Sequence, residues 1–254
     1  MPGKFILPPE RLHEFDRRGV VRIPGLLSAD RVSRAREHVR RRLTRMPCGP
    51  ISNKHPDIEG LLEDPALLDV VETLLDGVEY ERTKSAKRPQ ILVTLPNSDR
   101  WTVPGGWHAD LPRLASGRRP GVQVFMCLDT VQPRGGGTLV IAGSHRLLND
   151  GQLLKVKNFR PRLCRDPFFR ELYSEAEADV DRAQLLGRRG TVDDIELEVM
   201  EMTGAPGDAY LLDPRVLHTG APNAAAHPRI MATHRFVRVD VVDELTEAIG
   251  WEAG

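Results

Sequence analysis

Two histidines and an aspartate have the clearest capacity for chemistry in this chain. His108 and Asp110 stand two residues apart in the segment Trp107-His108-Ala109-Asp110, and His218 lies far along the chain. Side chains two apart on a β-strand point to the same face, so the imidazole and the carboxylate would lie side by side. With His218 as third ligand they would form the facial triad that holds Fe(II) in non-haem oxygenases. That triad leaves positions open for a co-substrate and O2.

Arg229 is the residue that could hold such a co-substrate. It follows His218 by eleven residues, across a Gly- and Pro-containing turn from Thr219 to Pro228. A hairpin of this length would return Arg229 to the neighbouring strand, beside the metal. A guanidinium binds a carboxylate bidentately, and a keto acid that chelates iron at one end needs such an anchor at its other end.

Other histidines are expected to have structural roles. The chain holds a second His-x-Asp pattern, His55-Pro56-Asp57. Its proline and polar flanks predict a loop rather than a strand, so we expect no metal there. His145 is expected in a turn, and His234 on the face opposite Arg229 if its strand is regular.

Residues 1–84 are expected to be mostly helical. Asp64 and Pro65 are typical of a helix N-terminus, and Gly77 is placed to end that helix. We expect helices over residues 8–18, 30–46 and 65–76, with a short apolar run at 20–23 between the first two.

The texture changes near Ser85, where short apolar runs alternate with Gly, Pro and Asn, which predicts strands. The runs cover residues 89–95, 103–110, 121–129, 137–142, 195–203, 208–213, 216–219 and 228–239. Eight strands with few helical spacers favour an antiparallel sandwich or barrel. Residues 147–194 interrupt them with a polar segment rich in Arg and aromatic residues, typical of a lid or substrate-binding insertion. We expect a single domain over 1–254, with its core in 85–146 and 195–239.

Composition excludes several classes of protein. The 254 residues include 36 Lys+Arg and 36 Asp+Glu, and 40% are hydrophobic, which is typical of a globular protein. Zero net charge gives no argument for a nucleic-acid or membrane partner, and the arginines of 31–45 indicate a solvated helix face. Three cysteines without a Cys-x-x-Cys pair support neither a disulfide framework nor a thiolate zinc site. Because no segment has the apolar length of a signal peptide or transmembrane helix, we expect a cytoplasmic protein.

Taken together, these motifs resemble the phytanoyl-CoA dioxygenase family of Fe(II)/2-oxoglutarate oxygenases. The resemblance rests on Trp107-His108-Ala109-Asp110, on the glycine-rich segment from Gly135 to His145, and on His218 with Arg229. It extends from about Pro89 to Val239. It implies a mainly β fold with a double-stranded β-helix (jelly-roll, cupin-like) core and the N-terminal helices packed on one face.

The resemblance also assigns roles to single residues. The implied iron ligands and catalytic centre are His108, Asp110 and His218, and Arg229 would pair with the distal carboxylate of 2-oxoglutarate. Family members make further co-substrate contacts from early strands, and the candidates here are Gln90, Thr94, Gln123 and Thr138. The implied cofactors are Fe(II), 2-oxoglutarate and O2, and the reaction would release succinate and CO2.

Asp110 also bears on the type of reaction, because related halogenases carry Ala or Gly at this place to open a chloride site. A carboxylate favours hydroxylation, with desaturation, cyclisation and epoxidation left open, of a small-molecule substrate. That substrate could be a natural-product intermediate of secondary metabolism, and the arginines of 147–194 leave an acidic one open. Two alternatives remain: a cupin-like metalloenzyme that does not use 2-oxoglutarate, and a non-catalytic jelly-roll binding protein. The oligomeric state is not predicted.

Overall fold

The structure is a computed structural model, and it describes residues 4–45, 54–82, 88–97, 101–147, 156–174 and 181–250. Met46, where the second helix was expected to end, Cys48, and the boundary expected between residues 84 and 85 lie outside these ranges.

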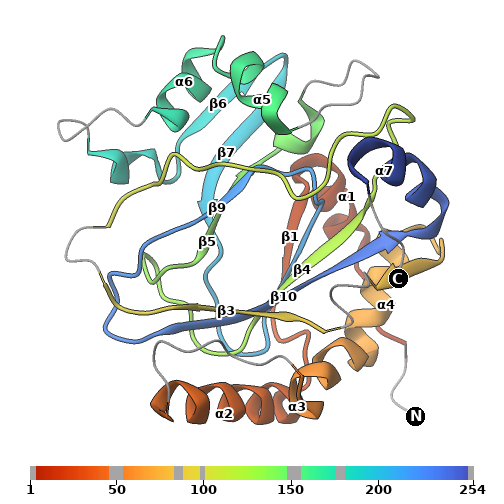
Figure 1. Ribbon diagram of the computed structural model, residues 1–254, viewed down its shortest axis with the longest axis vertical. Helices are drawn as coiled ribbons and strands as arrows, with labels where there is room; N and C mark the ends of the chain where they lie inside the picture. Colours follow the sequence, from red (N-terminus) through yellow and green to blue (C-terminus); the bar gives the residue numbers. More distant parts are fainter. Residues whose placement is uncertain are drawn as a thin grey trace.

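Two antiparallel sheets form the centre of the fold (Figure 1). The larger sheet has the order β1-β8-β4-β10-β2, with β3 also paired to β10, and the smaller has the order β6-β7-β5-β9. The larger sheet consists of β1 (Val20–Ile23), β8 (Ala209–Leu212), β4 (Gly121–Cys127), β10 (Arg229–Arg238), β2 (Tyr80–Arg82) and β3 (Gln90–Thr94). The smaller consists of β6 (Arg189–Val192), β7 (Ile195–Glu201), β5 (Thr138–Ala142) and β9 (His218–Gly220). The predicted mainly β core is therefore confirmed.

Side chains of the larger sheet alternate between two apolar layers. All seven residues of β4 are buried. Val124 and Met126 pack with the N-terminal helices, whereas Phe125 and Cys127 face the space between the sheets and pack with Val140 of β5. Period-2 alternation with both faces covered explains the near-continuous apolar run in the sequence.

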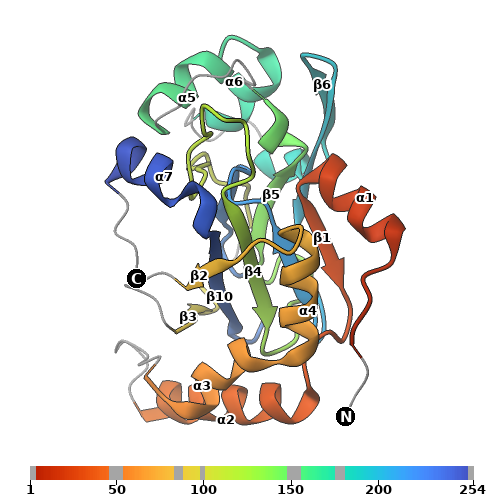
Figure 2. The same cartoon turned by 90° about the vertical axis from the view of Figure 1, so that its right-hand side faces the viewer.

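Four helices cover the outer face of the larger sheet (Figure 2), as the sequence predicted. They are α1 (Pro9–Arg18), α2 (Ala29–Arg45), α3 (Pro56–Glu59), which continues into the 3₁₀ turn Gly60–Glu63, and α4 (Pro65–Leu74). The Asp64 side chain accepts a hydrogen bond from Ala66 N at 3.2 Å, and Pro65 occupies the first turn of α4. Helix α1 ends at Gly19, whose φ of 69° suits a residue without Cβ.

The described parts of the 147–194 segment cover the outer face of the smaller sheet, at the end of the molecule opposite α2 and α3 (Figures 1 and 2). They form α5 (Val156–Leu163), α6 (Pro167–Tyr173), the 3₁₀ turn Arg182–Leu185 and strand β6. Phe169 and Leu172 pack with Leu139 and Ile141 of β5. These short elements were not predicted, because they lack the sustained periodicity that makes a helix or strand recognisable in a sequence.

Two expectations about local structure are wrong. Residues 103–110 do not form a strand, because only His108 makes a β-bridge there, to His218. His55-Pro56-Asp57 is not a loop: the His55 ring nitrogen Nδ1 accepts from Asp57 N at 3.3 Å and caps α3, with its proline in the first turn. The N-terminal part, expected to be mostly helical with an apolar run at 20–23, also contains β1 and β2. Strand β1 coincides with that run and pairs with β8.

Helix α7 (Val242–Ile249) follows the last strand and the 3₁₀ turn Val239–Val241. Its Leu245 packs with Leu111 and Leu114, which follow Asp110 by one and four residues. None of the helices in the described ranges combines the length and the apolar composition that crossing a membrane would require.

Candidate metal centre

His108, Asp110 and His218 meet between the two sheets. One ligand atom from each lies within 4.8 Å of the other two. His218 Nε2 is 3.7 Å from Asp110 Oδ2, and the two imidazole centroids are 4.3 Å apart. Within the described residues, no other group of three or more His, Cys, Asp or Glu side chains meets in this way. The structure therefore brings together the three residues that the sequence singled out.

A single backbone bridge sets the two histidines opposite each other. His108 N donates to His218 O at 3.0 Å, and His218 N donates to His108 O at 2.8 Å. His218 is the first residue of β9, which pairs with β5 through Val140. Two reciprocal hydrogen bonds thus replace the strand that had been expected over 103–110.

Hydrogen bonds at Nδ1 orient both imidazole rings. His218 Nδ1 lies 3.0 Å from Val216 O, and His108 Nδ1 lies 3.3 Å from Gly106 O. A carbonyl oxygen can only accept, so Nδ1 carries the proton in each ring and Nε2 keeps its lone pair for a metal. Burial lowers the pKa of His218, which favours the neutral form that ligates metals.

Asp110 is held through its backbone. Asp110 N donates to Pro214 O at 3.0 Å, and Leu111 N donates to the same oxygen at 3.2 Å. Pro214 stands between Asp213 and Arg215, so the carboxylate of the triad depends on the position of that short loop.

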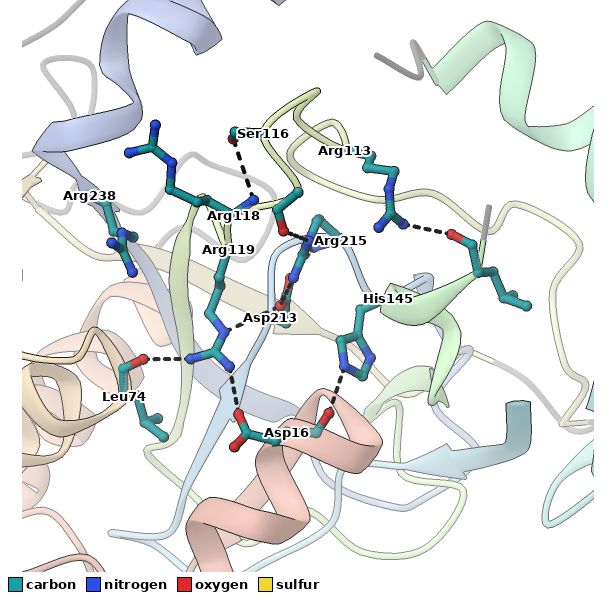
Figure 3. Close-up of polar contacts among 12 residues, drawn as sticks. Asp16, Leu74, Arg113, Ser116, Arg118, Arg119, His145, Asp213, Arg215 and Arg238 are labelled. Carbon is teal, nitrogen blue, oxygen red and sulfur yellow. Dashed lines mark hydrogen bonds and ion pairs between the residues drawn. The ribbon is translucent and has the colours of Figure 1, made fainter. Parts of the chain in front are cut away.

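A buried ion cluster fixes the loop (Figure 3). Asp213 is 1% exposed and binds Arg215 through Nη2 at 2.7 Å and Nε at 2.9 Å, with Arg119 Nε at 3.5 Å. Burial alone would raise the pKa of the Asp213 carboxyl, but the charge and hydrogen bonds of Arg215 hold it well below its usual range. Arg119 also reaches Asp16 of α1 at 2.7 Å, and His145 lies 3.1 Å from Asp16 O. The cluster therefore ties the loop to the N-terminal helix.

A cavity of about 280 Å³ opens beside the triad. Its lining comes from the facing sides of both sheets and from the segment that carries the triad. The lining residues are Gln90, Leu92, His108, Asp110, Gln123, Phe125, Thr138, His218, Gly220, Arg229, Thr233, His234 and Arg235. Of the predicted co-substrate contacts, Gln90, Gln123, Thr138 and Arg229 line this cavity. Thr94 does not, but it binds Arg229.

Arg229 is a buried cation with neutral partners. Its Nε donates to Gly136 O at 2.7 Å, Nη2 to Thr94 Oγ1 at 2.7 Å, and Nη1 to Leu92 O at 3.3 Å. A guanidinium has five N–H donors, and no carboxylate in the described ranges lies within 4.0 Å of it. Burial lowers the pKa of Arg229 to about 10, which still leaves it charged at neutral pH. Such a site suits a carboxylate supplied by a ligand.

The glycine-rich turn that holds Arg229 is itself fixed by Glu201. Glu201 Oε2 accepts from Arg134 N at 2.7 Å, and Oε1 accepts from Gly137 N at 3.2 Å. Gly136 between them has a φ of 81°, and its carbonyl accepts from Arg229. The conformation of this turn thus places the Gly136 carbonyl where it accepts a hydrogen bond from the Arg229 guanidinium.

Sequence reasoning missed several lining residues. Thr233 and Arg235 share a face of β10 with Arg229, and their even spacing from it could have identified them. His234 lies at odd spacing and packs against Phe236, with ring centroids 5.0 Å apart. Phe125 and Leu92 gave no signal beyond that of ordinary core residues.

Comparisons with known proteins agree with this arrangement. The family model described as Phytanoyl-CoA dioxygenase (PhyH) matches residues 15–231, which include the triad and Arg229. No curated protein matches the chain.

Solved structures show the same fold at low sequence identity. One is the epimerase SnoN in complex with Fe3+, alpha ketoglutarate and nogalamycin RO. It matches with a TM-score of 0.58 and 17% sequence identity, and the match covers 90% of this chain and 82% of SnoN. Another is HygX from Streptomyces hygroscopicus with nickel and 2-oxoglutarate bound. It matches with a TM-score of 0.59 and 16% sequence identity, and the match covers 92% of this chain and 88% of HygX. A third is EctD from S. alaskensis with 2-oxoglutarate and 5-hydroxyectoine. It matches with a TM-score of 0.60 and 18% sequence identity, and the match covers 94% of this chain and 79% of EctD. The predicted jelly-roll core is therefore confirmed.

Proposed function

The chain belongs to the phytanoyl-CoA dioxygenase family and is an Fe(II)/2-oxoglutarate-dependent dioxygenase, and from this premise we propose that His108, Asp110 and His218 hold its iron. We propose further that Arg229 binds the distal carboxylate of 2-oxoglutarate. The observation that carries both assignments is that the triad lines one cavity with a buried arginine that has no carboxylate partner among the described residues. The alternative of a cupin-like enzyme that does not use 2-oxoglutarate leaves this arginine without a role.

The residues present fit the metal. Two Nε2 lone pairs and one carboxylate are the donor set of the facial triad that suits Fe(II). When bound, the iron with 2-oxoglutarate and O2 supplies the oxidising power, and succinate and CO2 are released. The protein's part is to fix the two rings through their Nδ1–H bonds and to fix Asp110 through Pro214.

Arg229 would orient the co-substrate. Thr94 Oγ1 and the Gly136 carbonyl hold the guanidinium so that its remaining N–H groups are left for a carboxylate. Gln90, Gln123 and Thr138 would supply polar contacts along the cavity wall.

We propose hydroxylation of an unactivated carbon of a small molecule as the reaction, because Asp110 keeps the position that a halide would need. Natural-product chemistry is our preferred context, since the solved structures of similar fold include two enzymes from nogalamycin biosynthesis, SnoK and SnoN. We propose that 1–254 acts as one domain, because β1 of the N-terminal part is a strand of the core sheet.

We propose that 147–194 acts as a lid. Helix α6 contacts the segment that carries His108: Trp107 Nε1 donates to Leu172 O at 3.2 Å, and the Tyr173 hydroxyl donates to Trp107 O at 3.4 Å. A movement of α6 would therefore reach the segment that leads to the iron.

Anaerobic titration of the metal-free protein with Fe(II) and then with 2-oxoglutarate tests these assignments. The expected result is a weak visible charge-transfer band that appears only when both are present. Asp110→Ala should lose iron affinity, and Arg229→Ala should keep iron but bind 2-oxoglutarate weakly. His13→Ala, which alters an exposed histidine outside the cavity, is the matched control. Tight iron binding without the band would favour the cupin-like alternative, and no iron binding would favour a non-catalytic binding protein.

A further inference from the structure

A second arginine, Arg235, lines the same cavity from the same strand as Arg229. The two are six residues apart on β10, so they point to the same face and their Cα atoms are about 20 Å apart. Arg229 is paired in the sheet with Thr94 of β3, whereas Arg235 is paired with Gln123 of β4. The cavity therefore has one cation towards each end of β10.

Arg235 lies beside the triad, and among the described residues its one charged partner is Asp110. Its Nη1 is 3.9 Å from Asp110 Oδ2, which is longer than a hydrogen bond. In the described part of the chain nothing accepts a hydrogen bond from it, and no other carboxylate lies within 4.0 Å. Its side chain is 36% exposed, and its N–H groups make no hydrogen bond to the described residues, so they can donate to a ligand. Arg215, by contrast, already donates from Nε and Nη2 to the two carboxylate oxygens of Asp213.

The charge balance of the cavity leaves Arg235 uncompensated. Asp110, Arg229 and Arg235 are the carboxylate and guanidinium side chains in the lining. Fe(II) and the two arginines carry four positive charges, whereas Asp110 and the two carboxylates of 2-oxoglutarate carry three negative charges. With Asp110 bound to the metal, one positive charge remains, and its position is that of Arg235.

From this juxtaposition we propose that Arg235 binds an anionic group of the substrate, a carboxylate or a phosphate, close to the iron. The proposal rests on the proposed function, since it takes Asp110 as an iron ligand. It makes the substrate an acidic small molecule whose anionic group is fixed on the side of the triad away from Arg229. The carbon to be oxidised is then the one that this anchor presents to the iron.

Isothermal titration with matched anionic and neutral probes tests the proposal. The protein is loaded with redox-inactive Zn(II) and 2-oxoglutarate, with both affinities measured first, and is then titrated with benzoate against benzamide and phenyl phosphate against phenol. We expect wild type to bind each anion at least about tenfold more tightly than its neutral partner. Arg235→Gln should lose about ten- to hundredfold in anion affinity, as for a charge-assisted hydrogen bond.

Two further variants sharpen the test. Arg235→Lys should retain part of the anion affinity, because it keeps the charge without the fork. Arg189→Gln, which removes an arginine with a 78% exposed side chain outside the cavity, should behave as wild type. All variants should bind Zn(II) and 2-oxoglutarate within about twofold of wild type.

The outcomes separate this proposal from the assignment of the triad. If wild type binds metal and 2-oxoglutarate but shows no preference for anions, or Arg235→Gln keeps that preference, the proposal is overturned. Loss of Zn(II) or 2-oxoglutarate affinity in Arg235→Gln would also overturn it, since Arg235 would then support Asp110 or the co-substrate. Failure of wild type to bind metal or 2-oxoglutarate would overturn the proposed function, and this proposal with it.

Discussion

The backbone N–H of Asp110 donates a hydrogen bond to the carbonyl oxygen of Pro214 over 3.0 Å. This bond joins the carboxylate of the candidate iron site to a loop whose neighbouring residues, Asp213 and Arg215, form a buried ion pair (Figure 3). The loop then leads directly into β9, which begins with His218. Two of the three proposed ligands thus depend on one charged loop that does not line the cavity.

Replacement of Asp213 by Asn should destabilise the fold and weaken metal binding together. It leaves Arg215 buried without its carboxylate and Arg119 with that of Asp16 alone, and a buried charge without its partner typically costs about 3–5 kcal/mol in free energy of unfolding. Displacement of Pro214 should lower metal affinity by about tenfold or more. Urea denaturation and metal titration of the folded variant measure the two effects.

Asp240→Asn is the matched control, because Asp240 also pairs with arginines but at the surface. Its cost should be below about 1 kcal/mol, with unchanged metal affinity. Equal behaviour of the two variants would contradict the role given to the buried cluster.

Acid should destabilise the protein through His145. Burial lowers the pKa of its ring in the folded state, whereas the unfolded chain keeps a value of about 6.5. Below that pH the unfolded state binds the proton more readily, so the free energy of unfolding falls as pH falls from about 6.5 towards the folded-state pKa. Melting temperatures at pH 7.5 and 5.5 should show the loss, and His145→Gln should reduce it. The exposed His13→Gln should keep the wild-type dependence, and an unchanged dependence in His145→Gln would refute the assignment.

The candidate ligands could be predicted from the sequence because their spacing is a local pattern. The contacts that position them could not, because they join residues far apart in the chain. His108 and Asp110 stand two apart and Arg229 follows His218 by eleven residues, so a short pattern carries the ligands. The expected strand over 103–110 is wrong because one bridge, His108 with His218, does the positioning. The bond from Asp110 to Pro214 spans about a hundred residues and has no local signature. Arg235 was within reach of prediction, since alternation from Arg229 places it on the cavity face.

Thr94 should matter for the co-substrate although it does not line the cavity. Its Oγ1 accepts from Arg229 Nη2 at 2.7 Å, so Thr94→Val keeps the shape of the side chain and removes the acceptor. The guanidinium would lose orientation, and the Kd for 2-oxoglutarate should rise by about three- to tenfold with iron affinity unchanged. Thr191→Val on β6, an exposed position, is the control, and calorimetric titration of 2-oxoglutarate into the metal-loaded protein is the measurement. An unaltered Kd in Thr94→Val would mean that Arg229 is held by Gly136 and Leu92 alone.

A substitution at Gly136 tests whether the function of Arg229 requires the close packing of the glycine-rich turn against Thr94 and Asn223. It has a φ of 81°, and a Cβ there would lie 3.0 Å from Asn223 Cβ and 3.2 Å from Thr94 Cβ. Gly117 has a similar φ of 72°, but a Cβ added there would meet nothing within 4 Å. Gly117→Ala therefore isolates the backbone cost, about 1–2 kcal/mol, whereas Gly136→Ala adds steric displacement of the carbonyl that binds Arg229.

We expect Gly136→Ala to lose more free energy of unfolding than Gly117→Ala and, unlike it, to raise the Kd for 2-oxoglutarate by about tenfold or more. Denaturation and calorimetric titration of both variants give the comparison. If the two variants lose equal stability and bind 2-oxoglutarate equally well, the glycine-rich turn only reverses the direction of the chain and does not position Arg229. A selective loss in Gly136→Ala would instead establish that the close approach of Thr94, Asn223 and this turn exists to hold the guanidinium.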